Sequence, residues 1–303
     1  MITPNASNER ERQALVMVLG TARSGTTMLD LMLGNADDVF SCGEVWALYR
    51  PHRTHHFKPK CLCGDTDCDV WSNLSPNPES RFHAAALNQP GINFVVDSSK
   101  DLRWVLDSNE WARRSGIRVV NVVTWKDPID LAYSHWKRGR PVDYHRTAFL
   151  RYYGRILDLG LPFVSISYSR TIADPALALR QLCKYIGMDY QPGREEFWRK
   201  RHHHVFGSAG TAKQVSSGKS RLMIQREFPE DFVRQFEDLQ ERNENDNRLA
   251  DIIRHLEAHE LGGEACSDDA GFEKPLLKPA WYYYHMIKSI YRKWFPYAGP
   301  LAD

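Results

Sequence analysis

The chain has 303 residues and a formal net charge of +2, from 40 basic and 38 acidic side chains. This balance gives no sign of wholesale binding to nucleic acid or to a membrane surface, and 42% hydrophobic residues suffice for a substantial core. No run approaches the ~20 apolar residues of a membrane span, the first residues are polar, and the cysteines are too few for a disulfide-built fold. We therefore expect a cytoplasmic protein with one main domain.

The first predicted unit is a strand, a loop and a helix over residues 14–33. An apolar run of strand length is followed by a loop rich in glycine and hydroxyl side chains, and then by apolar residues with helical spacing. Because the first amides of a helix lack intrahelical partners and lie at the positive end of its dipole, such a unit attracts phosphate. Arg23 adds a planar, permanently charged group that suits phosphate or sulfate oxygens.

This loop departs from the Walker A pattern at one informative position. Gly20 and Gly25 keep the spacing of its glycines, but Thr26 stands where the pattern has lysine. The positive charge lies inside the loop instead, at Arg23. A nucleotide with a short 5′ chain and no γ-phosphate fits this arrangement without a magnesium ligand.

The run Arg23-Ser24-Gly25-Thr26-Thr27 resembles the 5′-phosphosulfate loop of the PAPS-dependent sulfotransferases, [RK]-S-G-T-T after the first strand. PAPS is 3′-phosphoadenosine 5′-phosphosulfate, the sulfonate donor of that family. The resemblance, to the bacterial, carbohydrate and tyrosylprotein branches, implies that these five residues bind the 5′ end of PAPS. It also implies that Arg23 stabilises the negative charge that grows on the bridging oxygen.

A short second strand is predicted over residues 39–42, followed by Gly43 and Glu44. Ligands of an open parallel sheet bind at the carboxyl ends of strands, where a carboxylate is placed to take a proton from an acceptor. Glu44 is alternatively a cap of the next helix. The tyrosylprotein and some carbohydrate sulfotransferases are similar here, with the glutamate as the base, and this likeness favours the catalytic role.

Residues 51–78 form a turn-rich insertion that contains histidines and the cysteines Cys61, Cys63 and Cys68. A C-x-C-x4-C cluster beside histidines is compatible with zinc, but it lacks the paired C-x2-C spacing of strong zinc motifs. A disulfide and plain loop cysteines are the alternatives. The histidines at 202–204 do not favour a metal, because consecutive histidines cannot all face one ion.

Residues 93–100 are typical of a buried strand that ends in polar residues. Apolar residues ending in Asp97 imitate the magnesium-binding strand of NTPases. In sulfotransferases this strand ends in a lysine-containing motif beside the transferred sulfonate, which implies that role for Lys100 or, alternatively, Ser99. Lys100 is otherwise a solvated residue at a helix start. The histidine that follows the lysine in the cytosolic branch is absent, so we expect Glu44 to be the base.

A helix is predicted over residues 102–115 and a central strand over 119–123, after which Pro128 is suited to start a helix. Lys126 and Ser134 are eight residues apart across this turn. That spacing is similar to the family's 3′-phosphate signature and implies that both bind the 3′-phosphate. Lysine in place of the usual arginine gives a point charge instead of a bidentate fork. Taken singly, each residue is also explained as an ordinary surface residue.

Later elements follow the same order. A helix is expected within residues 142–159, with one apolar side packed on the core, and a strand over 162–168. Tyr168 resembles the family tyrosine whose side chain meets the adenine. Asp174-Pro175 begins a helix that Gly187 ends.

The last third of the chain is less specific. Residues 211–220 are predicted to be either a flexible lid that brings positive charge to the 3′-phosphate or a solvated basic loop, and residues 229–259 are helical. An aromatic and basic amphipathic helix is expected over residues 281–295. We expect it to dock back on the domain rather than to contact a membrane or a partner.

Together these patterns predict a P-loop-like three-layer α/β sandwich with a central parallel sheet. We expect a sulfotransferase domain over residues 14–260, with 51–78 as its insertion, and a linker and docked helix over 261–303. The predicted activity moves sulfonate from PAPS to a hydroxyl or amine of a small-molecule or carbohydrate acceptor, without a metal, a nucleic-acid partner or a membrane span. The alternatives are a nucleotide kinase or NTPase with a degenerate P-loop, and a non-catalytic nucleotide-binding protein.

Overall fold

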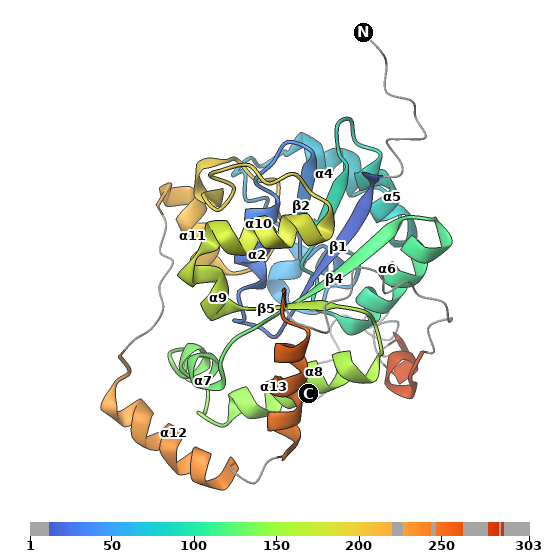
Figure 1. Cartoon of the computed structure of the whole chain (residues 1–303). Helices are drawn as coiled ribbons and strands as arrows, with labels where there is room; N and C mark the ends of the chain where they lie inside the picture. Colours follow the sequence, from blue (N-terminus) through green and yellow to red (C-terminus); the bar gives the residue numbers. More distant parts are fainter. Residues whose placement is uncertain (1–11, 220–226, 244–246, 263–277, 285, 288–303) are drawn as a thin grey trace.

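The computed structural model describes residues 12–219, 227–243, 247–262, 278–284, 286 and 287. Within these ranges one sheet is formed by β1 (Ala14–Leu19), β2 (Val39–Gly43), β3 (Phe94–Asp97), β4 (Arg118–Trp125) and β5 (Val164–Ser167). The strand order in space is β2-β3-β1-β4-β5, and every neighbouring pair is parallel. Parallel strands need crossover connections, and here these connections are mostly helical (Figure 1).

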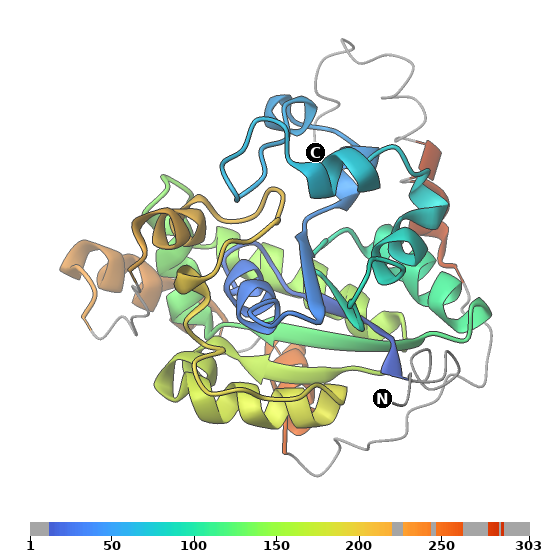
Figure 2. The same ribbon diagram turned by 90° about the horizontal axis from the view of Figure 1, so that it is seen from above.

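The helices, in chain order, are α2 (Thr26–Leu33), α3 (Trp46–Tyr49), α4 (Asp69–Leu74), α5 (Phe82–Leu87), α6 (Leu102–Arg114), α7 (Pro128–Trp136), α8 (Tyr144–Asp158), α9 (Tyr168–Ala173), α10 (Pro175–Ile186), α11 (Ala209–Ser217), α12 (Glu230–Asn243) and α13 (Asn247–Ala258). Short 3₁₀ turns lie at Thr54–Phe57, Glu79–Arg81 and Phe197–Arg199. Figure 2 shows the insertion, in light blue, gathered beside one end of β2.

Two hydrophobic layers sandwich the sheet, because successive side chains of a strand point to opposite faces. On one face Val16 of β1 shares a core with α2 and α10, and on the other Leu15 shares a core with α6, α8 and α13. Every β1 side chain is at most 1% exposed. Burial on both faces explains why β1 reads as an unbroken apolar run, and it confirms the predicted three-layer α/β sandwich.

Local signals set the ends of several helices where the sequence predicts them. The Asp174 side chain accepts a hydrogen bond from Leu177 N at 2.9 Å, Pro175 is the first residue of α10, and Gly187 ends that helix with φ 80°. The prediction was wrong for residues 211–220, since α11 covers most of this stretch. The predicted helical region 229–259 contains two helices, α12 and α13, on either side of residues 244–246, which lie outside the described ranges.

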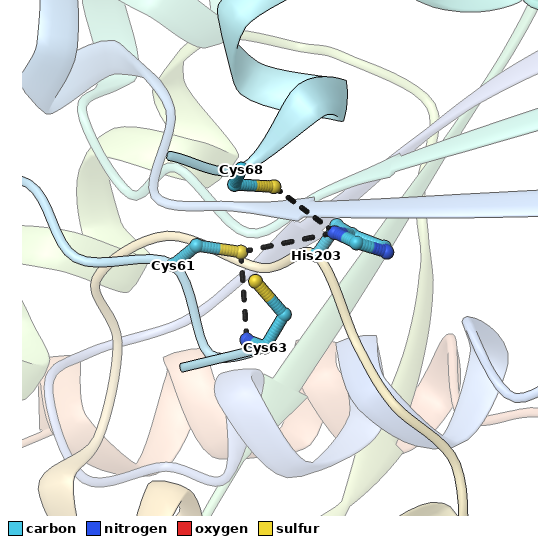
Figure 3. Close-up of side chains that lie close together, drawn as sticks. All are labelled: Cys61, Cys63, Cys68 and His203. Carbon is cyan, nitrogen blue, oxygen red and sulfur yellow. Dashed lines mark hydrogen bonds between the residues drawn. The ribbon is translucent and has the colours of Figure 1, made fainter. Parts of the chain in front are cut away.

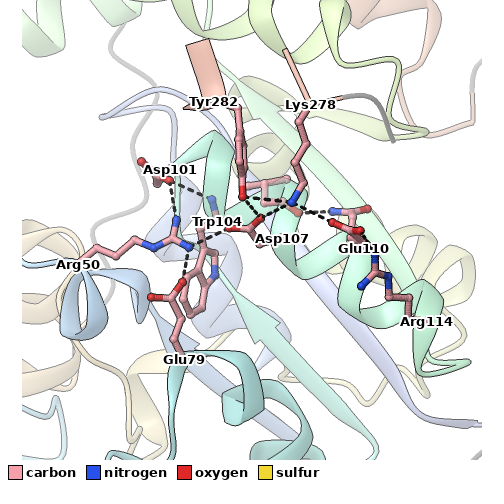
Figure 4. Close-up of polar contacts among 11 residues, drawn as sticks. Arg50, Glu79, Asp101, Trp104, Asp107, Glu110, Arg114, Lys278 and Tyr282 are labelled. Atoms are coloured by element: carbon pink, nitrogen blue, oxygen red, sulfur yellow. Dashed lines mark hydrogen bonds and ion pairs between the residues drawn. The ribbon is translucent and has the colours of Figure 1, made fainter. Parts of the chain in front are cut away.

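The described C-terminal residues contact α6 (Figure 4). The Tyr282 hydroxyl donates to Asp107 Oδ1 at 2.6 Å, and Lys278 pairs with Asp107 and Glu110 at 3.3 and 3.0 Å. Most of the predicted helix over 281–295 lies outside the described residues, so the division of the chain at residue 261 stays a prediction. Among the described helices, none has the length and apolar character needed to cross a bilayer.

Candidate functional site

The loop between β1 and α2 presents the N-terminus of α2 at the carboxyl edge of the sheet. Gly25 precedes the helix with φ 99°, and the first turn of α2 carries no acidic side chain that would neutralise its amides. Glycine is also required by space, because a Cβ at Gly20 would lie 2.4 Å from the Thr124 carbonyl oxygen. Ser24 donates to the Thr21 carbonyl from both its amide (3.2 Å) and its hydroxyl (2.8 Å), so its side chain shapes the loop.

Two tyrosines of α8 accept hydrogen bonds from the backbone of this loop. The Tyr152 hydroxyl accepts from Gly20 N at 3.2 Å, and the Tyr153 hydroxyl accepts from Thr21 N at 3.3 Å while it donates to the Thr124 carbonyl at 2.9 Å. The sequence predicts that one apolar side of this helix packs on the core, and it does not predict these hydroxyl contacts. A signal was present, since a tyrosine on a buried helix stripe needs a partner for its hydroxyl, but it does not say which loop provides that partner.

Arg23 is the loop residue under most constraint. It has φ 79°, a region that non-glycine residues seldom adopt, and its Nη1 donates to Ser208 Oγ at 3.1 Å. Its Nε is buried with no hydrogen-bond partner in the described residues. Burial lowers the pKa of Arg23, and the nearby charge of Arg138 lowers it further. A strained, buried guanidinium with an unused donor is suited to an anion that supplies the missing acceptor.

The second predicted anion loop meets the first at Tyr168. Lys126 Nζ lies 3.7 Å from the centroid of the Tyr168 ring, and a Cβ at Gly25 would lie 2.7 Å from the same ring. The pairing of β1 with β4 places Leu19 opposite Val123, so the two loops leave adjacent strand ends. Burial lowers the pKa of Lys126 to about 8; Asp130 opposes this shift and Arg23 adds to it.

Positive charge accumulates between these loops. Lys137 is exposed, but partial desolvation of its ammonium and then the charges of Arg23 and Arg138 lower its pKa. His135 lies beside Ser134 on α7, and its pKa is lowered to about 4 by burial and then by Arg23, which places this part of α7 near the β1–α2 loop. Ser134 itself is partly buried. Like charges gathered in this way repel one another, and a bound anion relieves the repulsion.

Glu44 and Lys100 form an ion pair, from Lys100 Nζ to Glu44 Oε1, at the ends of the adjacent strands β2 and β3. Their side chains are 24% and 18% exposed. The residue that caps α3 is Val45, so the Glu44 carboxylate is engaged with Lys100 and does not serve as a helix cap. Ser99, the alternative to Lys100, is fully buried and its hydroxyl accepts from Trp46 N at 3.1 Å.

A cavity of about 260 Å³ joins the β1–α2 loop to Lys100. Thr21 and Ala22 of the loop line it on one side, and the rings of Tyr152 and Trp281 contribute elsewhere to its wall. Cavities of this kind, with an apolar wall and a few charged groups, are where small molecules bind. Lys100 is therefore shared between the ion pair with Glu44 and the wall of a ligand-sized space.

Asp97 does not have the environment of a magnesium ligand. It is 0% exposed, and its Oδ2 contacts His83 Nε2 at 2.9 Å and accepts from Trp104 Nε1 at 2.8 Å, while Oδ1 accepts from Ser99 N at 2.7 Å. Both oxygens are thus used inside the core. This disfavours the kinase or NTPase alternative, which needs this carboxylate for a metal ion at the phosphates.

No protein-family model matches the sequence, and no curated protein matches it. Among solved structures, the chain is similar to the sulfotransferase domain from the curacin biosynthetic pathway, with TM-score 0.47 and 14% identity over 75% of this chain and 98% of that one. For a sulfotransferase from Alicyclobacillus acidocaldarius the TM-score is 0.45 and the identity 14%, and the match covers 84% of this chain and 98% of that one. For a mouse sulfotransferase complexed with PAP the TM-score is 0.39 and the identity 11%, and the match covers 82% of this chain and 89% of that one.

All three are sulfotransferases, the family that the two sequence motifs resemble. At such identities and scores we draw no functional argument from these likenesses. We base the function on the residues of this chain, and the site roles expected from the sequence stay predictions.

Proposed function

We propose that this protein transfers the sulfonate group of PAPS to a hydroxyl or amine of a small-molecule or carbohydrate acceptor. The observation that supports this most is the contact of both anion loops with one tyrosine ring. Lys126 and Gly25 lie against Tyr168, so groups suited to the 5′ end, the 3′-phosphate and the adenine of one nucleotide share a single region. Arg23 contributes an unused buried donor to that region.

In this proposal each residue acts on a separate part of the nucleotide. The α2 amides at Gly25, Thr26 and Thr27 and the Arg23 guanidinium bind the 5′ end, where charge grows as the bridging oxygen leaves. Ser24 holds the loop in shape. Lys126 and Ser134 bind the 3′-phosphate, and the adenine contacts Tyr168. PAPS is a substrate here, and no metal takes part in the step.

The acceptor occupies the cavity beside Lys100 in this scheme. Its nucleophilic atom attacks sulfur in line, the bond from sulfur to the bridging oxygen breaks, and adenosine 3′,5′-bisphosphate (PAP) leaves. Glu44 takes the acceptor proton, while Lys100 neutralises the sulfonate oxygens during transfer. The ion pair between these two residues holds the Glu44 carboxylate and the Lys100 ammonium together at the strand ends.

Two measurements test the proposal. Calorimetry with PAP and with ATP and magnesium separates the donor classes; we expect binding of PAP only, because Asp97 is engaged inside the core. Tight binding of ATP with magnesium and none of PAP would contradict the proposal. Incubation with PAPS and a panel of hydroxyl and amine acceptors, followed by mass spectrometry for sulfonated product, tests transfer itself, and binding of PAP without any product favours the non-catalytic alternative.

The variant Glu44→Gln tests the base. It keeps the shape of the side chain but cannot take the proton, so we expect turnover to fall by roughly 10²–10⁴-fold with PAP affinity little changed. The matched control is Glu195→Gln, which removes a carboxylate that pairs with the Tyr190 hydroxyl away from the sheet edge. Full activity of Glu44→Gln would show that another residue is the base.

A further inference from the structure

A second cluster of reactive side chains lies outside the anion site (Figure 3). Cys61, Cys63 and Cys68 of the insertion and His203 each direct one ligand atom to a common point, and these four atoms lie within 4.8 Å of one another. The Cys68 and Cys61 sulfurs are 3.1 and 4.0 Å from His203 Nδ1. All three cysteines are free thiols, so the disulfide alternative is not what the structure contains.

We propose that Cys61, Cys63, Cys68 and His203 bind one Zn²⁺ ion in a closed, structural site. Zinc–sulfur bonds of about 2.3 Å in a tetrahedron put neighbouring sulfurs roughly 3.8 Å apart, which matches the spread of these four atoms to within about 1 Å. Three thiolates and one imidazole are a usual structural set for this metal. A closed set of four leaves no open position for a substrate, so the ion stabilises structure and takes no part in sulfonate transfer.

The surroundings of the cluster fit a bound zinc thiolate centre. Three thiolates and one divalent ion carry a net charge of −1, and the Arg201 guanidinium lies near Cys63 while it pairs with Asp65. The indole of Trp71 donates to the His203 carbonyl at 2.9 Å, which fixes the backbone that carries the histidine ligand. Such contacts around the ligands orient them and compensate their charge.

The consecutive histidines of this segment face different ways, as in an extended chain. His203 faces the cysteines, whereas the His204 ring contacts Ser41 Oγ at 3.0 Å through Nδ1. His202 is turned to the Phe197 carbonyl at 2.7 Å. The sequence argument that three adjacent histidines cannot share one ion is therefore right, but one of them joins cysteines that are 135 to 142 residues away.

The site ties the insertion to the segment that completes the anion loop. Leu62 N donates to the His204 carbonyl at 2.9 Å, and Val205 N donates to the Cys42 carbonyl of β2 at 3.3 Å. A few residues further on, Ser208 accepts from Arg23 and donates from its amide to Thr27 Oγ1 at 3.1 Å. Zinc at His203 thus anchors a short segment whose other end contacts the β1–α2 loop.

Metal analysis of the full-length protein tests the site without reference to transfer activity. We expect about one zinc per chain after purification in reducing buffer, and its release when a thiol-modifying reagent is added, seen with a chelating dye. A protein that stays metal-free after exposure to zinc with all thiols reduced, or one in which two of these cysteines are oxidised to a disulfide, overturns the proposal.

Variants assign the ligands. Cys63→Ser and His203→Ala should each lose most of the bound zinc and unfold at a lower temperature, since metal binding stabilises the folded chain. The matched controls are Cys183→Ala in α10 and His55→Ala in the insertion. Both should keep about one bound zinc ion per chain. Zinc retained by both ligand variants would overturn the assignment.

Replacement of the metal by Co²⁺ gives a readout that does not depend on how the variants fold. Tetrahedral cobalt bound by thiolates shows ligand-to-metal charge-transfer bands and intense visible bands, and the wild-type protein should show both. Visible bands of octahedral cobalt without charge transfer would mean that the thiolates are not ligands. Because zinc content and cobalt spectra need no PAPS, failure of this proposal and failure of the sulfotransferase function are distinguishable.

Discussion

The two cationic loops at the sheet edge are built in different ways. The β1–α2 loop is fixed by backbone and hydroxyl groups, with its amides held by Tyr152 and Tyr153 and its arginine held by Ser208. The β4–α7 loop has one partly buried cation, Lys126, on a tyrosine ring, and exposed cations further along the chain, including Lys137. The first loop gives charge a fixed direction, which transition-state stabilisation requires. The second gives charge without fixed geometry, which suits affinity for a phosphate.

Removal of the fixed charge should have the largest effect. We expect Arg23→Ala to lower turnover by roughly 10²–10³-fold, the usual consequence of deleting one preorganised donor to a developing charge. PAP should bind more weakly as well, but by less than turnover falls. Initial rates of product formation and calorimetry with PAP measure the two effects separately.

The matched control for this variant is Arg138→Ala, which deletes an exposed cation close enough to lower the pKa of Arg23. We expect it to change turnover by less than about tenfold, because exposed charges are screened by solvent and salt. Equal losses in the two variants would show that the summed charge of the region matters and that the fixed geometry of Arg23 does not.

The second loop should instead show its contribution as a pH dependence. With a pKa of about 8 in the free protein, Lys126 loses its proton as the pH rises through 8, and the 3′-phosphate then loses its cationic partner. PAP affinity should fall by up to about tenfold for each pH unit above 8, and phosphate binding should raise the pKa of Lys126. Calorimetry between about pH 7 and pH 9.5 measures this fall, because that interval begins below the Lys126 pKa of about 8 and ends before the ordinary lysine pKa is reached.

Stability of the free protein should change in the opposite sense. Because the pKa of Lys126 is lower in the folded than in the unfolded chain, the unfolded state binds more protons between pH 8 and the ordinary lysine pKa of 10.5. The contribution of Lys126 to the free energy of unfolding therefore rises with pH in that window.

Lys126→Arg is the control for the pH dependence of PAP binding, since arginine stays charged and PAP affinity should then be independent of pH. A pH dependence that persists in Lys126→Arg would assign it to another group.

The contrast between the loops also explains what the sequence could predict. The β1–α2 loop was found because its strand, glycines, arginine and hydroxyl residues are contiguous, and the alternation of elements was enough to predict the parallel sheet. Its supports were missed because Tyr153 and Ser208 are 132 and 185 residues away from their partners in the loop. Local sequence can indicate that a buried tyrosine hydroxyl needs a partner, but it does not identify a partner so far away in the chain.

The same limit applies to the cysteine cluster and to α11. The spacing of Cys61, Cys63 and Cys68 is weak evidence for zinc when it is read alone, and it becomes strong only when the fold brings His203 to them. Residues 211–220, which contain lysines, serines and a glycine, were predicted to be a lid or a solvated basic loop, whereas α11 covers 209–217. The fold places Ser208 against Arg23 and Thr27, and these contacts fix the start of α11.

The smallest effect we expect comes from removing the Tyr153 hydroxyl, which supports the β1–α2 loop. Tyr153→Phe keeps the ring in the core but leaves Thr21 N and the Thr124 carbonyl without their hydroxyl partner. Loss of a buried hydrogen-bond partner costs about 1–3 kcal/mol, and we expect this loss in chemical denaturation. PAP affinity should fall only a few-fold, because a loosened loop must be reordered by its ligand.

Tyr190→Phe is the control for Tyr153→Phe, since the Tyr190 hydroxyl donates to Glu195 near the surface at 3.1 Å. Solvent replaces that bond, so both stability and PAP affinity should be nearly unchanged. If Tyr153→Phe were destabilised with PAP affinity and turnover intact, the hydroxyl would serve folding alone. The fixed direction of the Arg23 charge would then come from the contacts that remain in this variant, among them Arg23 with Ser208 and Gly20 N with the Tyr152 hydroxyl.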